Sequence, residues 1–225
     1  MRPPTPAHLA LPAASSGVLM AAYLLLRPYG DHGAATGASA ASAFVDPMWV
    51  VAHLCGALAL ANLARLALRM HDLVGSVATQ AGRWAGLAGA VLVLPYYGAE
   101  TFGLHAIGRA AASDPHVMDL VPAVRDHPAA LTSFGVGLVL LAVAGLVVAG
   151  AWQRLDPSWG VTPWAAWPMG LAAALVLPQY VLPPPGRMAF GVTYLVAAGV
   201  LVAASRSAHR GASRESSAPE PLRTS

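Results

Sequence analysis

The stretch of sequence with the clearest chemical potential is residues 96–105, where polar side chains follow a long apolar run. It contains Tyr96, Tyr97, Glu100 and His105. An ionisable group at membrane depth is unfavourable by several kcal/mol unless it is neutralised, paired or in water, so Glu100 is a candidate functional residue. Burial favours the neutral form of a carboxylic acid, and Glu100 would then serve as a general acid.

His53 is the predicted partner of Glu100. Trp49, His53 and Gly56 are spaced four and three apart, which places them on one face of a helix. At about 1.5 Å of rise per residue, His53 and Glu100 lie roughly 9 and 11 Å below the outer ends of their helices. If the two helices face each other, His53 can exchange a proton with Glu100.

Further polar and aromatic side chains are predicted in the outer half of the same bundle. Such a layer is what an outward-facing pocket requires, and aromatic faces stabilise a developing cation. The residues predicted to bind the substrate are Trp49, Tyr96, Tyr97, His105, Gln179, Tyr180 and Tyr194.

Apolar helices must position these residues. The chain is 56% hydrophobic and only 10% charged, which is too apolar for a soluble domain of this length. The fold class is therefore predicted as all-α, a polytopic membrane bundle with six transmembrane helices over residues 10–205. The predicted spans are 10–26, 48–66, 84–107, 129–152, 164–182 and 188–205. Asp46 is predicted to cap the second span and Pro95 to bend the third. Glycines are predicted to allow close packing of the fourth span and prolines to interrupt the fifth; they are Gly135, Gly137 and Gly145, and Pro168 and Pro178. Residues 1–9 are predicted to be an N-terminal cytoplasmic segment, and residues 206–225 a disordered cytoplasmic tail.

The distribution of arginine predicts the topology. All 13 basic residues are arginine, and placing both termini in the cytoplasm leaves only Arg27, Arg109, Arg125 and Arg187 on the outer side. The localisation is therefore predicted as the cell membrane. The outer connection at 108–128 carries an apolar stripe that predicts a short interfacial helix, either a lid or a simple connector.

The composition also excludes several kinds of chemistry. The absence of lysine excludes a Schiff base, and the single cysteine, Cys55, excludes an intramolecular disulfide and a CxxC motif. The sequence has no phosphate-binding glycine loop, no His-Glu-x-x-His motif and no Asp-rich magnesium cluster, so neither a cofactor nor a metal is expected. The expected partners are the lipid bilayer and a hydrophobic small molecule, and nucleic acid is not expected. The sequence does not determine the oligomeric state.

Four interpretations of the polar layer remain open. Glu100 could be a protonated structural residue that holds the bundle together. It could be the general acid, with His53, for acid–base chemistry on an isoprenoid or lipid-like substrate. His53 and His105 could be axial ligands of a b-type haem, or form a metal site with Glu100. Finally, Glu100 could serve transport or a sensor or assembly role.

Two resemblances accompany these interpretations. The layout resembles a family of six-span actinobacterial membrane proteins in which Trp-x-x-x-His opens the second span, here Trp49 to His53, and a glutamate interrupts the third, here Glu100. That resemblance covers about residues 10–205 and implies no particular activity. The arrangement is also similar to integral membrane terpene cyclases, which set acidic residues within a small helical bundle and so imply terpenoid cyclisation. This chain lacks a second acid at the depth of Glu100, since Asp46 lies at the rim.

Overall fold

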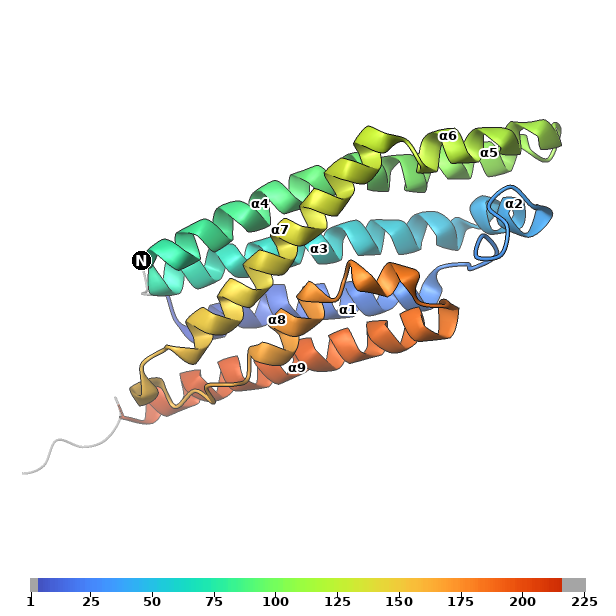
Figure 1. The fold of residues 1–225 in the computed structure, drawn as a ribbon. Helices are drawn as coiled ribbons and strands as arrows, with labels where there is room; N and C mark the ends of the chain where they lie inside the picture. Colours follow the sequence, from blue (N-terminus) through green and yellow to red (C-terminus); the bar gives the residue numbers. More distant parts are fainter. Residues whose placement is uncertain (1–3, 216–225) are drawn as a thin grey trace, which may run out of the picture.

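The computed structural model describes residues 4–215, with side chains as far as residue 207, and every regular element in that range is helical (Figure 1). The prediction of an all-helical bundle is confirmed. The long helices are α1 (Ala10–Leu26), α3 (Pro47–Val74), α4 (Val77–Gly98), α7 (Pro128–Gln153) and α9 (Pro184–Glu215). The short helices are α2 (Ala38–Val45), α5 (Leu104–Ala110), α6 (Val121–Arg125) and α8 (Trp167–Ala174).

Within the described residues, five helical stretches are long and apolar enough to cross a membrane. They are Pro6–Leu26, Pro47–Val74, Val77–Ala110, Pro128–Gln153 and Pro184–Ser207. The outward faces expose apolar side chains such as Val91 and Val196, whereas polar Ser16 and Thr101 are buried between helices. That distribution of polarity suits a bundle surrounded by lipid.

The segment predicted as a fifth span, residues 164–182, differs from a continuous helix. Helix α8 ends at Ala174, and the chain continues through turns into the 3-10 helix η5 (Pro178–Val181). Pro168 lies in the first turn of α8, where a missing N–H is tolerated, whereas Pro178 cannot continue a helix. The segment still runs along the bundle from the end of α7 to the start of α9 (Figure 1).

Helix α3 continues past the predicted end of its span at residue 66, because the glycine that ends it, Gly75, lies further along the chain. At its start, Asp46 Oδ1 accepts a hydrogen bond from the Met48 amide at 2.8 Å, the cap that the sequence predicts. At its end, Gly75 adopts a left-handed conformation with φ of 66° and Ser76 caps α4. The connection between α3 and α4 is therefore a tight turn.

Glu100 lies in a π-helical segment, η2 (Ala99–Gly103), between α4 and α5. Pro95, predicted to bend this span, lies inside α4 just before it. A π segment inserts an extra residue into a helix and thereby turns the side chains that follow. Such segments are frequent at functional sites, and here the inserted turn carries the buried carboxylate.

The 108–128 connection folds back onto the bundle as the 3-10 helix η3 (Pro115–Leu120) followed by α6. Of its predicted apolar stripe, Val121 is buried and Val124 is partly buried, whereas Leu120 is 55% exposed. Together with α2 and α5 it closes one end of the bundle, which we call the α6 end (Figure 1). The small core there consists of Ala40, Phe44, Trp49, Leu104, Met118 and Val121.

Glycines allow α4, α7 and α8 to pack closely. A Cβ on Gly137 would lie 2.9 Å from the carbonyl oxygen of Gly89, and a Cβ on Gly170 would lie 2.9 Å from that of Gly145. Small residues are expected at such membrane-helix contacts, as predicted for Gly137 and Gly145. Gly135, for which the same role is predicted, has open space around it.

Candidate functional site

A cavity of about 270 Å³ lies towards the α6 end, between the long helices and η5. Five residues singled out in the sequence line it: His53, Tyr96, Tyr97, Glu100 and Tyr180. They come from α3, α4, η2 and η5, so the structure brings these five side chains to one cavity.

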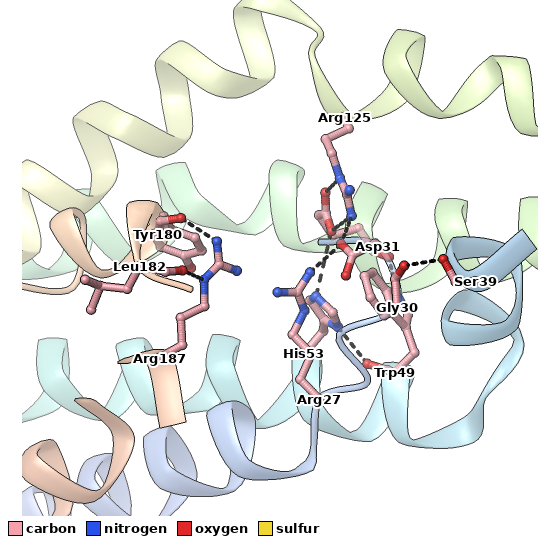
Figure 2. A network of polar contacts seen from close by, with 11 residues as sticks. Arg27, Gly30, Asp31, Ser39, Trp49, His53, Arg125, Tyr180, Leu182 and Arg187 are labelled. Carbon is pink, nitrogen blue, oxygen red and sulfur yellow. Dashed lines mark hydrogen bonds and ion pairs between the residues drawn. The ribbon is translucent and has the colours of Figure 1, made fainter. Parts of the chain in front are cut away.

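Ionic contacts join four charged side chains in an alternating chain (Figure 2). Arg27 donates to Asp31 at 2.7 Å, and Arg125 donates to the same carboxylate oxygen at 2.9 Å. Arg125 also holds Glu100 with two hydrogen bonds, from Nε to Oε1 at 2.7 Å and from a terminal nitrogen to Oε2 at 3.1 Å. Two parallel bonds from a guanidinium favour the ionised carboxylate, so Glu100 carries a negative charge here.

Arg125 reaches this chain because α6 folds over the end of the bundle, and its guanidinium lies 5.5 Å from the ring centre of Phe44. Burial lowers the pKa of Arg125, but its hydrogen bonds to Glu100 and the charges of Glu100 and Asp31 outweigh that effect. The pKa of Arg125 is therefore raised above its ordinary value. The residue fastens the 108–128 segment to the bundle through charge as well as through apolar packing.

His53 lies beside Glu100 in a defined orientation. Its Nδ1 is 2.7 Å from the carbonyl oxygen of Trp49, which can only accept a hydrogen bond, so Nδ1 carries the proton. In the neutral ring, Nε2 therefore bears a lone pair, and it lies 3.8 Å from Glu100 Oε2. Both side chains are nearly fully buried, at 2% and 5% exposed.

Trp49 contacts both His53 and Glu100 but does not line the cavity. Its indole N–H donates to the backbone carbonyl of Glu100 at 2.7 Å, and its ring is 4.2 Å from that of His53. The Arg27 guanidinium also packs on this tryptophan, 5.0 Å from the centre of the Trp49 ring. One tryptophan thus fixes the π-helical segment, the imidazole and a cation together.

An aromatic wall forms another side of the cavity. Tyr96 stacks on Phe134 with ring centres 4.4 Å apart, and Phe134 meets Tyr180 edge-on at 5.5 Å. The Tyr97 and Tyr180 hydroxyls are 3.3 Å apart, and Gly56 leaves the space that the Tyr97 hydroxyl occupies. This wall offers apolar ring faces with hydroxyl groups at their edges.

Besides Trp49, three residues predicted to bind the substrate lie outside the lining of this cavity. His105 Nδ1 bonds the carbonyl of Phe44 at 2.7 Å, and Tyr194 bonds the Ser16 hydroxyl at 3.0 Å on the α1 side of α9. Gln179 is buried, and its Oε1 has no hydrogen-bond partner among the described residues. Depth along a helix does not determine the direction of a side chain, which is set by the rotation of the helix.

The sequence interpretation missed most of the charged lining. Asp31, His32 and three arginines, Arg27, Arg125 and Arg187, line the cavity, together with the aromatic residues Tyr23 and Phe134. One sequence signal could have indicated the arginines, because all three are predicted on the outer side, where arginine is depleted. Asp31 also follows Arg27 by four positions. It is a second acid in the lining of the cavity, and it shares Arg125 with Glu100.

The metal and haem interpretation finds little geometric support in the described residues. His53 lines the cavity whereas His105 does not. Over the same residues, no group of three or more His, Cys, Asp or Glu side chains is placed to hold a metal ion.

Comparisons of the chain with protein-family models, with curated proteins and with solved structures found no match. Function must therefore be argued from the geometry of the cavity.

Proposed function

We propose that this protein is an integral membrane enzyme that carries out acid–base chemistry on a hydrophobic, isoprenoid or lipid-like substrate in this cavity. The observation that carries the proposal is the orientation of His53: Nδ1–H is held by the Trp49 carbonyl while Nε2 faces Glu100 at 3.8 Å. A buried imidazole with a free Nε2, oriented through its other nitrogen and flanked by a carboxylate, is arranged to accept and return a proton.

The roles within the pair differ from those that the sequence alone suggested. Because Arg125 holds Glu100 as a carboxylate, Glu100 is not the proton donor in this mechanism. Nε2 of His53 takes a proton from the substrate, the carboxylate stabilises the imidazolium that forms, and the same nitrogen returns the proton to another substrate atom. Tyr97 and Tyr180 orient the substrate with their ring faces and their hydroxyl groups, which lie 3.3 Å apart. A proton removed from one carbon and returned to another shifts a double bond, so such a shuttle would carry out an isomerisation.

We also propose that the chain crosses the membrane six times, with both termini in the cytoplasm. The start of α1 and the end of α9 lie at the same end of the bundle, which requires an even number of crossings (Figure 1). Residues 164–182 would be the crossing that is added to the five continuous helices. It is the fifth in chain order and is interrupted at η5. Non-helical backbone is tolerated at membrane depth where it lines a cavity, and Tyr180 of η5 does line it.

The catalytic proposal can be tested without knowing the substrate. The purified protein is reconstituted with an isoprenoid-rich lipid extract in D₂O, and the lipids are analysed by mass spectrometry. A proton shuttle exchanges with solvent, so the wild-type protein should place deuterium on carbon in a defined lipid. The His53→Gln variant should lose this incorporation.

His71→Gln serves as the matched control, because His71 is on the same helix and bonds Thr79 at the far end of α3. It should incorporate deuterium like the wild type. Incorporation no greater than in protein-free vesicles, or full incorporation by a folded His53→Gln variant, would refute the acid–base function.

A further inference from the structure

The formal charges around the cavity do not balance. Three arginines and two carboxylates line it, so with neutral histidines the lining carries one excess positive charge. Arg27 and Arg125 are paired with Asp31, and Arg125 is also paired with Glu100. The remaining cation is Arg187.

Arg187 has only neutral partners among the described residues. Its Nε donates to the carbonyl of Leu182 at 3.0 Å, and a terminal nitrogen donates to the carbonyl of Tyr180 (Figure 2). Its guanidinium lies 5.7 Å from the centre of the Tyr180 ring. These contacts fix the position of Arg187 at the end of η5, but they leave its charge without a counter-ion in the described part of the chain.

Arg27 adds a second unmet requirement at the same cavity. The residue is only 8% exposed, and its Nε is buried without a hydrogen-bond partner among the described residues. A buried donor left unsatisfied is unfavourable, and in native proteins it commonly marks the place of a water or a ligand. Two arginines of one cavity therefore have unused capacity for an acceptor.

We infer that the cavity binds the anionic headgroup, a carboxylate or a phosphate, of an amphiphilic molecule. Arg187 and Arg27 would hold the headgroup oxygens, and the wall formed by Tyr96, Phe134 and Tyr180 would lie against the adjoining hydrocarbon. Guanidinium groups are suited to both anions because their N–H groups match the spacing of the oxygens. The inference rests on the proposed function in taking this cavity as the substrate site, and it adds the substrate class.

The size of the cavity supports an amphiphile entering by its head. A volume of about 270 Å³ lies just below the roughly 300–1,000 Å³ typical of small-molecule sites. It accommodates a headgroup and the first carbons, and the rest of a long chain would extend into lipid. Binding of an anion would explain why these arginines lie on the predicted outer side, where the positive-inside rule does not favour arginine.

Binding to the protein in nanodiscs of neutral phosphatidylcholine tests this inference. The probes are a long-chain fatty acid, an alkyl phosphate, the alcohol of the same chain length, and inorganic phosphate. Both anionic amphiphiles should bind at least about tenfold more tightly than the alcohol, because hydrogen bonds to charged groups contribute more than neutral ones. Inorganic phosphate should compete only weakly. Competition by inorganic phosphate at similar strength would assign the site to a soluble anion and overturn the amphiphile.

Arg187→Gln should remove the preference for anions, and Arg187→Lys should restore part of it. Arg109→Gln is the matched control, since Arg109 is exposed and does not line the cavity, and it should keep the wild-type preference. Equal affinity for the alcohol and the acids, or an unchanged preference in a folded Arg187→Gln variant, would overturn the inference.

Deuterium exchange and anion preference, measured on the same wild-type preparation, separate this inference from the proposed function. Anion preference without any deuterium exchange in the wild type would reject the catalytic function alone. Exchange without anion preference would reject the headgroup site alone.

Discussion

At the scale of single residues, the central feature is the alternation of charge from Arg27 through Asp31 and Arg125 to Glu100, ending at His53. Each carboxylate lies next to a guanidinium, so no charged group in this series of four side chains is buried without an opposite charge. Removing one member leaves its partners unpaired in a weakly polar interior, which is far less favourable than the intact pair. Arg125 is the most sensitive point because it serves two carboxylates.

Arg125→Ala should lower the free energy of unfolding by about 3–5 kcal/mol, the range for breaking a buried ion pair. Thermal or denaturant unfolding in detergent measures the change. Arg69→Ala is the control, because the Arg69 and Asp72 side chains are 48% and 50% exposed, and its effect should stay within about 0–1 kcal/mol. Equal effects of the two substitutions would mean that the buried network does not stabilise the fold.

The protonation of His53 is a second prediction at this scale. We expect the neutral ring with the proton on Nδ1, because the Trp49 carbonyl at 2.7 Å can only accept. Nitrogen-15 NMR of histidine-labelled protein distinguishes the two neutral tautomers, and His53→Gln assigns the signal. A proton on Nε2 would remove the base from the proposed mechanism.

At the scale of elements, the site depends on two departures from regular helix. The π-helical segment η2 carries Glu100, and the 3-10 helix η5 carries Tyr180. The long helices that surround them pack closely where glycines allow it, as α4 and α7 do at Gly89 and Gly137. The regular helices therefore fix the positions of the irregular turns, and the turns carry the polar groups.

Gly137→Ala should destabilise the bundle by about 1–3 kcal/mol, as overpacking does elsewhere. The new Cβ would lie 2.8 Å from Val93 Cγ1 and 2.9 Å from the Gly89 carbonyl, so α4 and α7 must separate. Gly135→Ala on the same helix meets nothing within 4 Å and should leave unfolding unchanged or slightly more difficult. Similar unfolding midpoints for the two variants would argue against the close α4–α7 contact.

At the scale of the whole molecule, one end of the bundle is closed by a small apolar core and the other holds the start of α1 and the end of α9 (Figure 1). The cavity lies near the closed end, and three arginines gather there. The positive-inside rule counts these arginines against the predicted orientation. In the folded molecule these arginines line the cavity, so their place on the predicted outer side does not argue against that orientation.

Cysteine labelling tests the six crossings. In a Cys55→Ala background, Ser158→Cys and Pro183→Cys place exposed thiols before and after the interrupted segment. An impermeant maleimide applied to intact cells should label Pro183→Cys, and should label Ser158→Cys only after permeabilisation. Labelling of both from the same side would show that residues 164–182 do not cross.

The sequence by itself determined the helical bundle, the positions of caps such as Asp46, and the level at which polar groups collect. These features follow from hydrophobic periodicity and local hydrogen bonding, which are written in short stretches of chain. Glu100, His53 and the tyrosines of the cavity were identified in this way. Pro178 also indicated an interruption of residues 164–182, but the end of α8 at Ala174 was not predicted, because prolines are tolerated in many membrane helices.

Only the tertiary structure decided what surrounds Glu100. Arg125 and Asp31 are 94 positions apart and meet because two connections fold over the same end of the bundle. Helix depth gives the level of a side chain but not its direction, and Tyr194 and His105, which were predicted in the site, bond to Ser16 and to Phe44 instead. The partner of the buried carboxylate, and with it the division of roles between Glu100 and His53, depends on long-range packing that no local pattern encodes.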